Sequence, residues 1–188
     1  MPTSGGLSPT AYDAWYHTAR GAWMGEVEAQ TLLRQGAITP GSRVLDAGCG
    51  SGWFSRRFSA AGARVVGVDR DRAMLVTAHS ADAGVAWIQA DMGSLPFPDR
   101  HFDVVCAVTS LCFAEDEAAA LGEMLRTARQ TVLLGLLHRH SLLYTRKQGR
   151  GAYAGAHWHT PQDTMDKVCP ESLDAVGEAA LLAIPRIR

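Results

Sequence analysis

The sequence predicts an α/β fold with a doubly wound, mostly parallel sheet and helices on both faces. Short apolar, β-branched runs alternate with segments of helical pattern along the chain. Three of these runs lead to Asp46, Asp69 and Asp91, which lie about 22 residues apart. That interval holds one helix and one return strand, so the connections are predicted to be right-handed crossovers between parallel strands.

The predicted elements follow in order from this alternation. An amino-terminal part, residues 1–36, contains helices over residues 10–20 and 24–36. The core, residues 42–137, begins with a buried strand and ends with an apolar one, and its helices fall between strands. Within it we expect strands over residues 42–46, 64–68, 85–89, 102–108 and 131–137, and helices over residues 52–61, 71–80 and 116–128.

The remaining segment, residues 138–188, completes a single domain. Residues 170–183 are expected to be helical, and Pro185 interrupts the short run that follows. Because proline cannot donate to a strand ladder, Pro185 argues against a central strand. We therefore expect five or six strands, an incomplete carboxyl-terminal hairpin and an edge that a dimer partner could cover, so that monomer and homodimer both stay open.

The stretch over residues 44–52 is the most informative motif. An apolar run ends in Asp46, and Gly48, Gly50 and Gly52 follow with single residues between them. Glycines allow a sharp turn and let a ligand touch bare backbone, and the amides that open the next helix point toward that ligand. Acids at the ends of parallel strands converge at one sheet edge, where α/β proteins bind ligands. A lone aspartate is more often a helix cap or turn residue, but the set favours a nucleoside-type ligand.

These motifs resemble the class I S-adenosylmethionine-dependent methyltransferases, which have a Rossmann-like fold, and more narrowly the small-molecule branch that includes ubiquinone and menaquinone biosynthesis enzymes. Residues 44–54 are similar to the first motif of the family, Asp69 to its ribose-binding acid, and Asp91-Met92 to its adenine-binding pair. Residues 95–97 and 102–105 are similar to its fourth-strand block.

The resemblance implies S-adenosylmethionine as cofactor and methyl transfer to a small organic acceptor by in-line displacement. It implies that the backbone at Gly48 and Gly50 meets the methionine part, that Asp69 accepts from both ribose hydroxyls, and that Asp91 and Met92 meet the adenine. One ionised carboxylate suits a vicinal diol because it accepts two charge-assisted hydrogen bonds. The predicted cofactor-binding residues are Tyr12, Asp46, Gly48, Cys49, Gly50, Asp69, Arg70, Asp91, Met92 and Thr109.

Two other nucleotide sites fit the glycine loop less well. A triphosphate-binding loop needs a lysine after its glycines, and none follows here. A dinucleotide loop needs a third glycine at position 53, which is Trp53 in this chain, although an acid after the second strand suits both ligands. A non-catalytic S-adenosylmethionine-binding module or scaffold remains the alternative from another functional class.

The amino-terminal helix carries Tyr12, Trp15, Tyr16 and Ala19 at helical spacing, an aromatic stripe that is ordinarily core. In the family that this chain resembles, the segment forms a lid, so we favour a lid with Tyr12 as the contact. Trp53 is predicted either to flank the methionine part or to pack on the sheet.

No catalytic residue is assigned, because methyl transfer needs alignment and water exclusion more than acid–base groups. If the acceptor needs a base, four histidines after the fifth strand are weak candidates, since a lone histidine is more often structural. Thr109 and Ser110 border the same space and could instead be strand-end caps. The four histidines are His138, His140, His157 and His159.

Composition limits the partners. The net charge is −1 over 188 residues, so no overall field attracts nucleic acid or anionic membranes, and the basic cluster over residues 139–150 is expected to be a solvated surface. A nucleic-acid methyltransferase is therefore the less favoured prediction. The four cysteines lack metal-ligand spacing, so we expect reduced thiols and no metal site. Without a leader pattern or a long apolar stretch, a cytoplasmic location is expected.

Overall fold

The computed structural model describes residues 8–82, 84–139, 146, 148–150, 153, 155–160, 173–176 and 179–185, the last two ranges by their backbone. Its strands form one seven-stranded sheet in the order β3-β2-β1-β4-β5-β7-β6. The strands are β1 (Arg43–Ala47), β2 (Arg64–Asp69), β3 (Ala86–Gln89), β4 (Phe102–Val108), β5 (Ala128–Leu137), β6 (Leu173–Val176) and β7 (Ala179–Pro185).

The first five strands are parallel, as the sequence predicts. The order reverses between β1 and β4, because the chain builds outward from β1 to β3 and then returns to add β4 and β5 on the other side of β1. The chain leaves β1 toward α3 (Trp53–Ala60) on one face of the sheet and β4 toward α5 (Glu117–Thr127) on the other, which leaves the crevice in which α/β proteins bind ligands.

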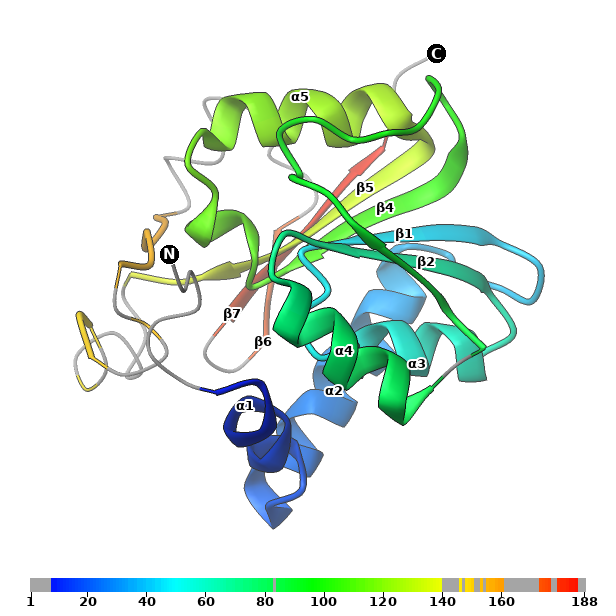
Figure 1. Ribbon diagram of the computed structural model, residues 1–188. Coiled ribbons are helices and arrows are strands. Elements are labelled where there is room, and N and C mark those ends of the chain that lie inside the picture. Colours follow the sequence, from blue (N-terminus) through cyan, green and yellow to red (C-terminus); the bar gives the residue numbers. More distant parts are fainter. Residues whose placement is uncertain are drawn as a thin grey trace.

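Helices cover both faces of the sheet (Figure 1). Four of them lie on one side and the fifth lies on the other, so the predicted three-layer arrangement is confirmed. The helices are α1 (Pro9–Tyr16), α2 (Ala19–Gln35), α3 (Trp53–Ala60) and α4 (Arg72–Ala81) on the first side and α5 (Glu117–Thr127) on the second, and a short 3-10 turn, η1 (Leu111–Phe113), follows β4.

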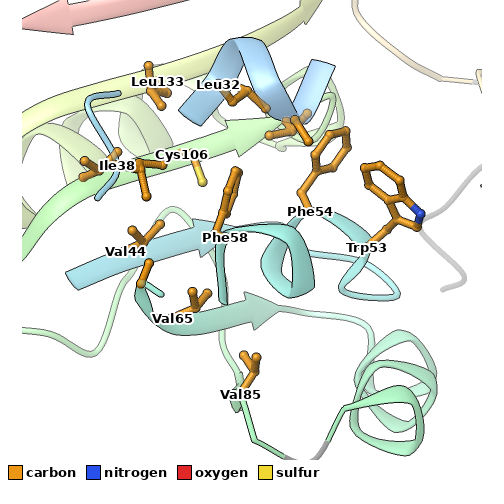
Figure 2. Close-up of a cluster of buried hydrophobic side chains, with 14 of the residues drawn as sticks. Leu32, Ile38, Val44, Trp53, Phe54, Phe58, Val65, Val85, Cys106 and Leu133 are labelled. Atoms are coloured by element: carbon orange, nitrogen blue, oxygen red, sulfur yellow. The ribbon is translucent and has the colours of Figure 1, made fainter. Parts of the chain in front are cut away.

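The core under α2 and α3 is built around aromatic side chains. Figure 2 shows Phe54 and Phe58 extending from α3 into the space between the sheet and α2, with Leu32 above Phe58. Phe58 and Leu32 are essentially inaccessible to solvent. Burying such side chains contributes about 1.5–3 kcal/mol each, so this cluster anchors the helix that follows the glycine loop.

The amino-terminal helices divide at a different place from the predicted one. One helix is predicted over residues 10–20, whereas α1 ends at Tyr16 and α2 already begins at Ala19. Thr18 caps α2 with its hydroxyl, which accepts a hydrogen bond from the Gly21 amide. A Cβ at Gly21 would collide with the Trp15 carbonyl oxygen, so glycine permits the close turn.

This break also changes the aromatic stripe. Ala19 belongs to α2 and does not continue the face of α1. Trp15 is 42% exposed, whereas Tyr16 is buried against α3. The prediction of one continuous aromatic face is therefore wrong beyond Tyr12 and Tyr16.

A helix over residues 170–183 and an incomplete hairpin are predicted, but the structure contains a hairpin of β6 and β7. β7 pairs antiparallel with β5 along its whole length, and β6 pairs antiparallel with β7. Alanine and leucine suit a helix, but pairing with the open edge of β5 overrides that weak preference. Pro185 is the last residue of β7, where proline is tolerated, so it does not interrupt the ladder. The expected free edge at β5 is absent.

Candidate functional site

The main pocket among the described residues opens at the carboxyl ends of the parallel strands, beside the reversal between β1 and β4. It holds about 1070 Å³ of empty space, part of which is open to solvent. Its walls come from α1, the glycine loop, the start of α3, and the residues that follow β2, β3 and β4. All ten residues predicted to bind a cofactor line this one pocket.

The glycine loop forms the floor. Gly48, Gly50 and Gly52 all have positive φ, at 74°, 54° and 78°. A Cβ at Gly48 would collide with Ser110 and would lie 2.7 Å from the Met92 methyl carbon, so this position requires glycine twice over. A Cβ at Gly50 would meet only Tyr12, at 3.9 Å. The backbone at Gly50 therefore lies open toward the pocket.

Asp69, the last residue of β2, is fixed by backbone amides. One carboxylate oxygen accepts from the Gly50 amide and the other from the Asp71 amide, each at 2.8 Å. Each oxygen keeps a second lone pair for a ligand. Burial raises the pKa of Asp69, while these two amide hydrogen bonds oppose the rise. The carboxylate is thus held rigidly with acceptor capacity facing the pocket.

A charged network closes the far side. Arg70 Nη1 lies 3.0 Å from Glu115 Oε1 and 3.9 Å from Asp91 Oδ2. Asp91 also accepts from the Gly93 amide at 2.7 Å, so it is a turn residue as well as a pocket residue. Half of its side chain is exposed, which leaves an acceptor at the pocket rim.

Asp46 lies below the glycine loop and is fully buried. Its Oδ2 accepts from the Ser55 hydroxyl at 2.5 Å, and Cys106 Sγ lies 3.8 Å from its Oδ1. Burial raises its pKa from 3.8 to about 6, and the nearby Asp69 adds to that rise. The same burial raises the pKa of Cys49, so the Cys49 thiol stays protonated and is no nucleophile.

Tyr12 and Thr109 meet across the pocket. Tyr12 extends from α1, its hydroxyl lies 3.4 Å from that of Tyr16, and the Thr109 side chain is close enough to lower the pKa of Tyr12. Burial raises the pKa of Tyr12, so its phenol is neutral. Thr109 follows β4 with φ of 52°, a rare conformation for a β-branched residue that points to a constrained site. Next to it, the Ser110 hydroxyl donates to the Ala47 carbonyl at 2.7 Å, so Ser110 does tie down a strand end.

The candidate histidines lie elsewhere. His138, His157 and His159 do not line the pocket, and His140 lies outside the described residues. His157 Nδ1 and His159 Nε2 lie 3.2 and 3.6 Å from Glu117 Oε1, at the first turn of α5. Within the described part of the chain, no group of three or more His, Cys, Asp or Glu residues is arranged to hold a metal ion.

Several aromatic and apolar residues of the pocket wall are not predicted from the sequence. Phe54 and Phe113 come from α3 and η1, and their only sequence signal is closeness to a strand end. Trp53, for which two roles stay open, lines the pocket and also stacks on Tyr16 at 4.5 Å. The other wall residues not predicted as ligands are Tyr16, Asp71, Met74, Ala90, Val108, Ser110 and Ala114.

The middle of the chain is similar to known methyltransferases. A family described as a methyltransferase domain matches residues 45–134, which contain the glycine loop, Asp69 and Asp91. The malonyl-[acyl-carrier protein] O-methyltransferase of Serratia marcescens is 35% identical over 100 residues, which cover 53% of this chain and 39% of that protein. Over these residues the chain is similar to the class I S-adenosylmethionine-dependent methyltransferases. S-adenosylmethionine is the cofactor of this family.

Solved structures of methyltransferases share the fold of this chain over nearly its whole length. An S-adenosylmethionine-dependent methyltransferase from Thermotoga maritima, described as a possible histamine N-methyltransferase, superposes with a TM-score of 0.75 at 20% identity and covers 95% of this chain and 96% of its own. Magnesium protoporphyrin IX methyltransferase from Synechocystis, solved with bound S-adenosylhomocysteine, superposes with a TM-score of 0.68 at 19% identity and covers 96% and 95%.

The chain spans about two fifths of the length of the curated relative from Serratia. Its described helices include none that is both long enough and apolar enough to cross a bilayer.

Proposed function

We propose that this chain transfers a methyl group from S-adenosylmethionine to a small organic acceptor. The observation that supports this most is the convergence of all ten predicted ligand positions on one pocket at the sheet reversal. These positions come from α1 and from the ends of four strands, so their meeting is not a consequence of sequence proximity.

The residues present fit this cofactor. A methionine tail needs a surface free of side chains, and Gly50 offers bare backbone in the pocket. A ribose diol needs a fixed double acceptor, which Asp69 provides through its two unused lone pairs. An adenine amino group needs an acceptor at the rim, and Asp91 is placed there beside Met92.

The cofactor supplies an electrophilic methyl group on a positively charged sulfur. The chain supplies alignment and a dry site, because Tyr12, Tyr16, Phe54 and Phe113 wall the pocket. Neither histidine nor lysine is among the described pocket residues, so the acceptor is expected to be nucleophilic without a base from them. In-line displacement suits this arrangement, since it depends on orientation more than on proton transfer.

Turnover distinguishes an enzyme from a non-catalytic binding module. Carboxylic acids, a malonyl thioester, phenols and amines are offered as acceptors, and S-adenosylhomocysteine formation is measured. The thioester is included because the relative from Serratia is named for a malonyl carrier. Formation of product with one acceptor class supports the enzyme. Tight cofactor binding with no product from any class favours the module.

Cofactor affinity tests the site directly. Asp69→Asn removes the charge that strengthens both diol hydrogen bonds, so we expect affinity to fall by about 1–3 kcal/mol in calorimetry. Asp82→Asn is the matched control, since Asp82 also accepts a backbone amide, from Gly84 at 2.7 Å, but lies outside the pocket. Equal affinity for the wild type and the Asp69 variant would place the ribose elsewhere.

A further inference from the structure

A closed triangle of polar groups fastens α1 to the glycine loop. Asp13 Oδ1, on α1, accepts from the Ser51 hydroxyl at 2.9 Å and from Arg56 Nη2 at 3.2 Å. Arg56 Nη1 in turn donates to the Ser51 carbonyl oxygen at 2.7 Å. One residue of the triangle thus comes from α1, one from the glycine loop and one from α3.

The triangle is shielded from water. Ser51 is fully buried, and the side chains of Asp13 and Arg56 are only 19% and 17% exposed. Charge-assisted hydrogen bonds in such a place are stronger than ion pairs on the surface. The neighbouring pair between α2 and α3, Glu26 and Arg57, provides the contrast, because its atoms are 3.7 Å apart and its side chains are 52% and 36% exposed.

The short α1 needs such contacts. It has eight residues, and a helix of two turns is marginal by itself in water. Its carboxyl end is held where Tyr16 stacks on Trp53. One turn earlier, Asp13 holds the helix on the loop side, next to Tyr12, whose ring lies over Gly50 and reaches Thr109. The part of α1 that carries Tyr12 over the pocket is therefore fixed by Asp13.

None of the three residues of the triangle lines the pocket. A substitution in the triangle therefore removes no side chain from the pocket wall and acts through how firmly α1 is held over it. We propose that Asp13 is a positioning residue, which latches α1 over the bound cofactor and sets how long the cofactor and its demethylated product remain in the pocket. This inference rests on the proposed function, because it needs S-adenosylmethionine in that pocket.

Dissociation of S-adenosylhomocysteine tests the latch, measured by stopped-flow displacement and tryptophan fluorescence. Asp13→Ala is expected to raise the dissociation rate about tenfold, with an association rate that is unchanged or faster, because breaking a contact of the closed state acts mainly on release. Asp13→Asn keeps an oxygen acceptor for Ser51 and loses the charge, so its rate should be intermediate. That partial rescue is not expected if Asp13 serves only general stability.

A double-mutant cycle isolates the contact. Ser51→Ala alone should speed release, and adding it to Asp13→Ala should have little further effect, because both changes break the same hydrogen bond. Glu26→Ala is the matched control, an acid that pairs with the other arginine of α3, and it should leave release unchanged. Thermal unfolding without ligand identifies any variant that fails to fold, and Asp13→Asn then carries the test.

The outcomes separate the two proposals. If the wild type binds S-adenosylhomocysteine and both Asp13 variants release it at the wild-type rate, the latch is refuted and the proposed function stands. A release rate raised equally by Glu26→Ala would also refute it. If the wild type binds neither S-adenosylmethionine nor S-adenosylhomocysteine, the proposed function fails and the latch with it.

Discussion

The carboxyl ends of β1 and β2 and the carboxyl end of β5 lie on the same edge of the sheet, yet they differ in what they contribute to the pocket. Asp46 and Asp69 belong to their strands, so the strand itself delivers them to the pocket. His138 follows β5 just as directly, but it pairs with His159 in an isolated bridge and is not a pocket residue. Adjacency to a strand end is thus informative for β1 to β4, whose carboxyl ends face the pocket, and not for β5.

The largest effect that would sharpen this comparison is expected at Gly48. Gly48→Ala adds a Cβ that collides with Ser110 and forces an L residue to φ of 74°. Strain costs about 1–3 kcal/mol and crowding a similar amount, so we expect a loss of about 4 kcal/mol in the free energy of unfolding. Cofactor binding should fall with it. Urea unfolding and calorimetry measure the two.

Gly41→Ala is the control for Gly48→Ala. Gly41 has φ of 88°, and no atom lies within 4 Å of a Cβ added there. It should therefore show the strain without the crowding and leave cofactor affinity unchanged. Equal losses for the two variants would contradict the close approach of the glycine loop to the residues after β4.

A second, smaller effect concerns Asp46, the buried acid at the carboxyl end of β1. Folding raises the pKa of Asp46 from 3.8 to about 6, so between these values the folded protein binds more protons than the unfolded chain. The free energy of unfolding must then fall as the pH rises through this window. A shift of this size corresponds to a loss of about 3 kcal/mol, nearly complete one pH unit above the folded pKa.

Asp46→Asn removes this titration and keeps an oxygen that can accept from Ser55. The variant should therefore gain about 2 kcal/mol in stability relative to the wild type as the pH rises from 4 to 7, because all other groups cancel in the difference. Urea unfolding at several pH values measures it. A difference independent of pH would show that Asp46 is not buried as described.

Much of the region at the carboxyl ends of β1 and β2 can be predicted because its sequence signals are local. Asp69 ends an apolar run and Gly48 follows another, so strand, turn and ligand group lie within a few residues of each other. The break between α1 and α2 has an equally local signal, since Thr18 is a favoured N-cap residue. The helical spacing of the aromatic residues across the break favours one continuous helix instead.

The hairpin could not be predicted in the same way because its cause is distant in the sequence. Leu181 pairs with Gly135, and no pattern near Leu181 announces that partner. Alanine and leucine fit a helix and a buried strand alike, so pairing with β5 decides the structure. The Asp13 latch could not be predicted from the sequence for the same reason, since Asp13 contacts Ser51 and Arg56 only after folding.

The smallest expected effect tests whether the histidines after β5 take part in the reaction. His157 is 76% exposed and pairs with Glu117, so His157→Gln should change stability by less than about 1 kcal/mol. Since neither residue lines the pocket, the rate of methyl transfer and its pH profile should match the wild type. A general base normally contributes about 10²–10⁴-fold, so a loss of that size with His157→Gln or His159→Gln would bring the end of β5 into the chemistry. It would also mean that α5 and the segment over residues 155–160 move toward the pocket when the acceptor binds.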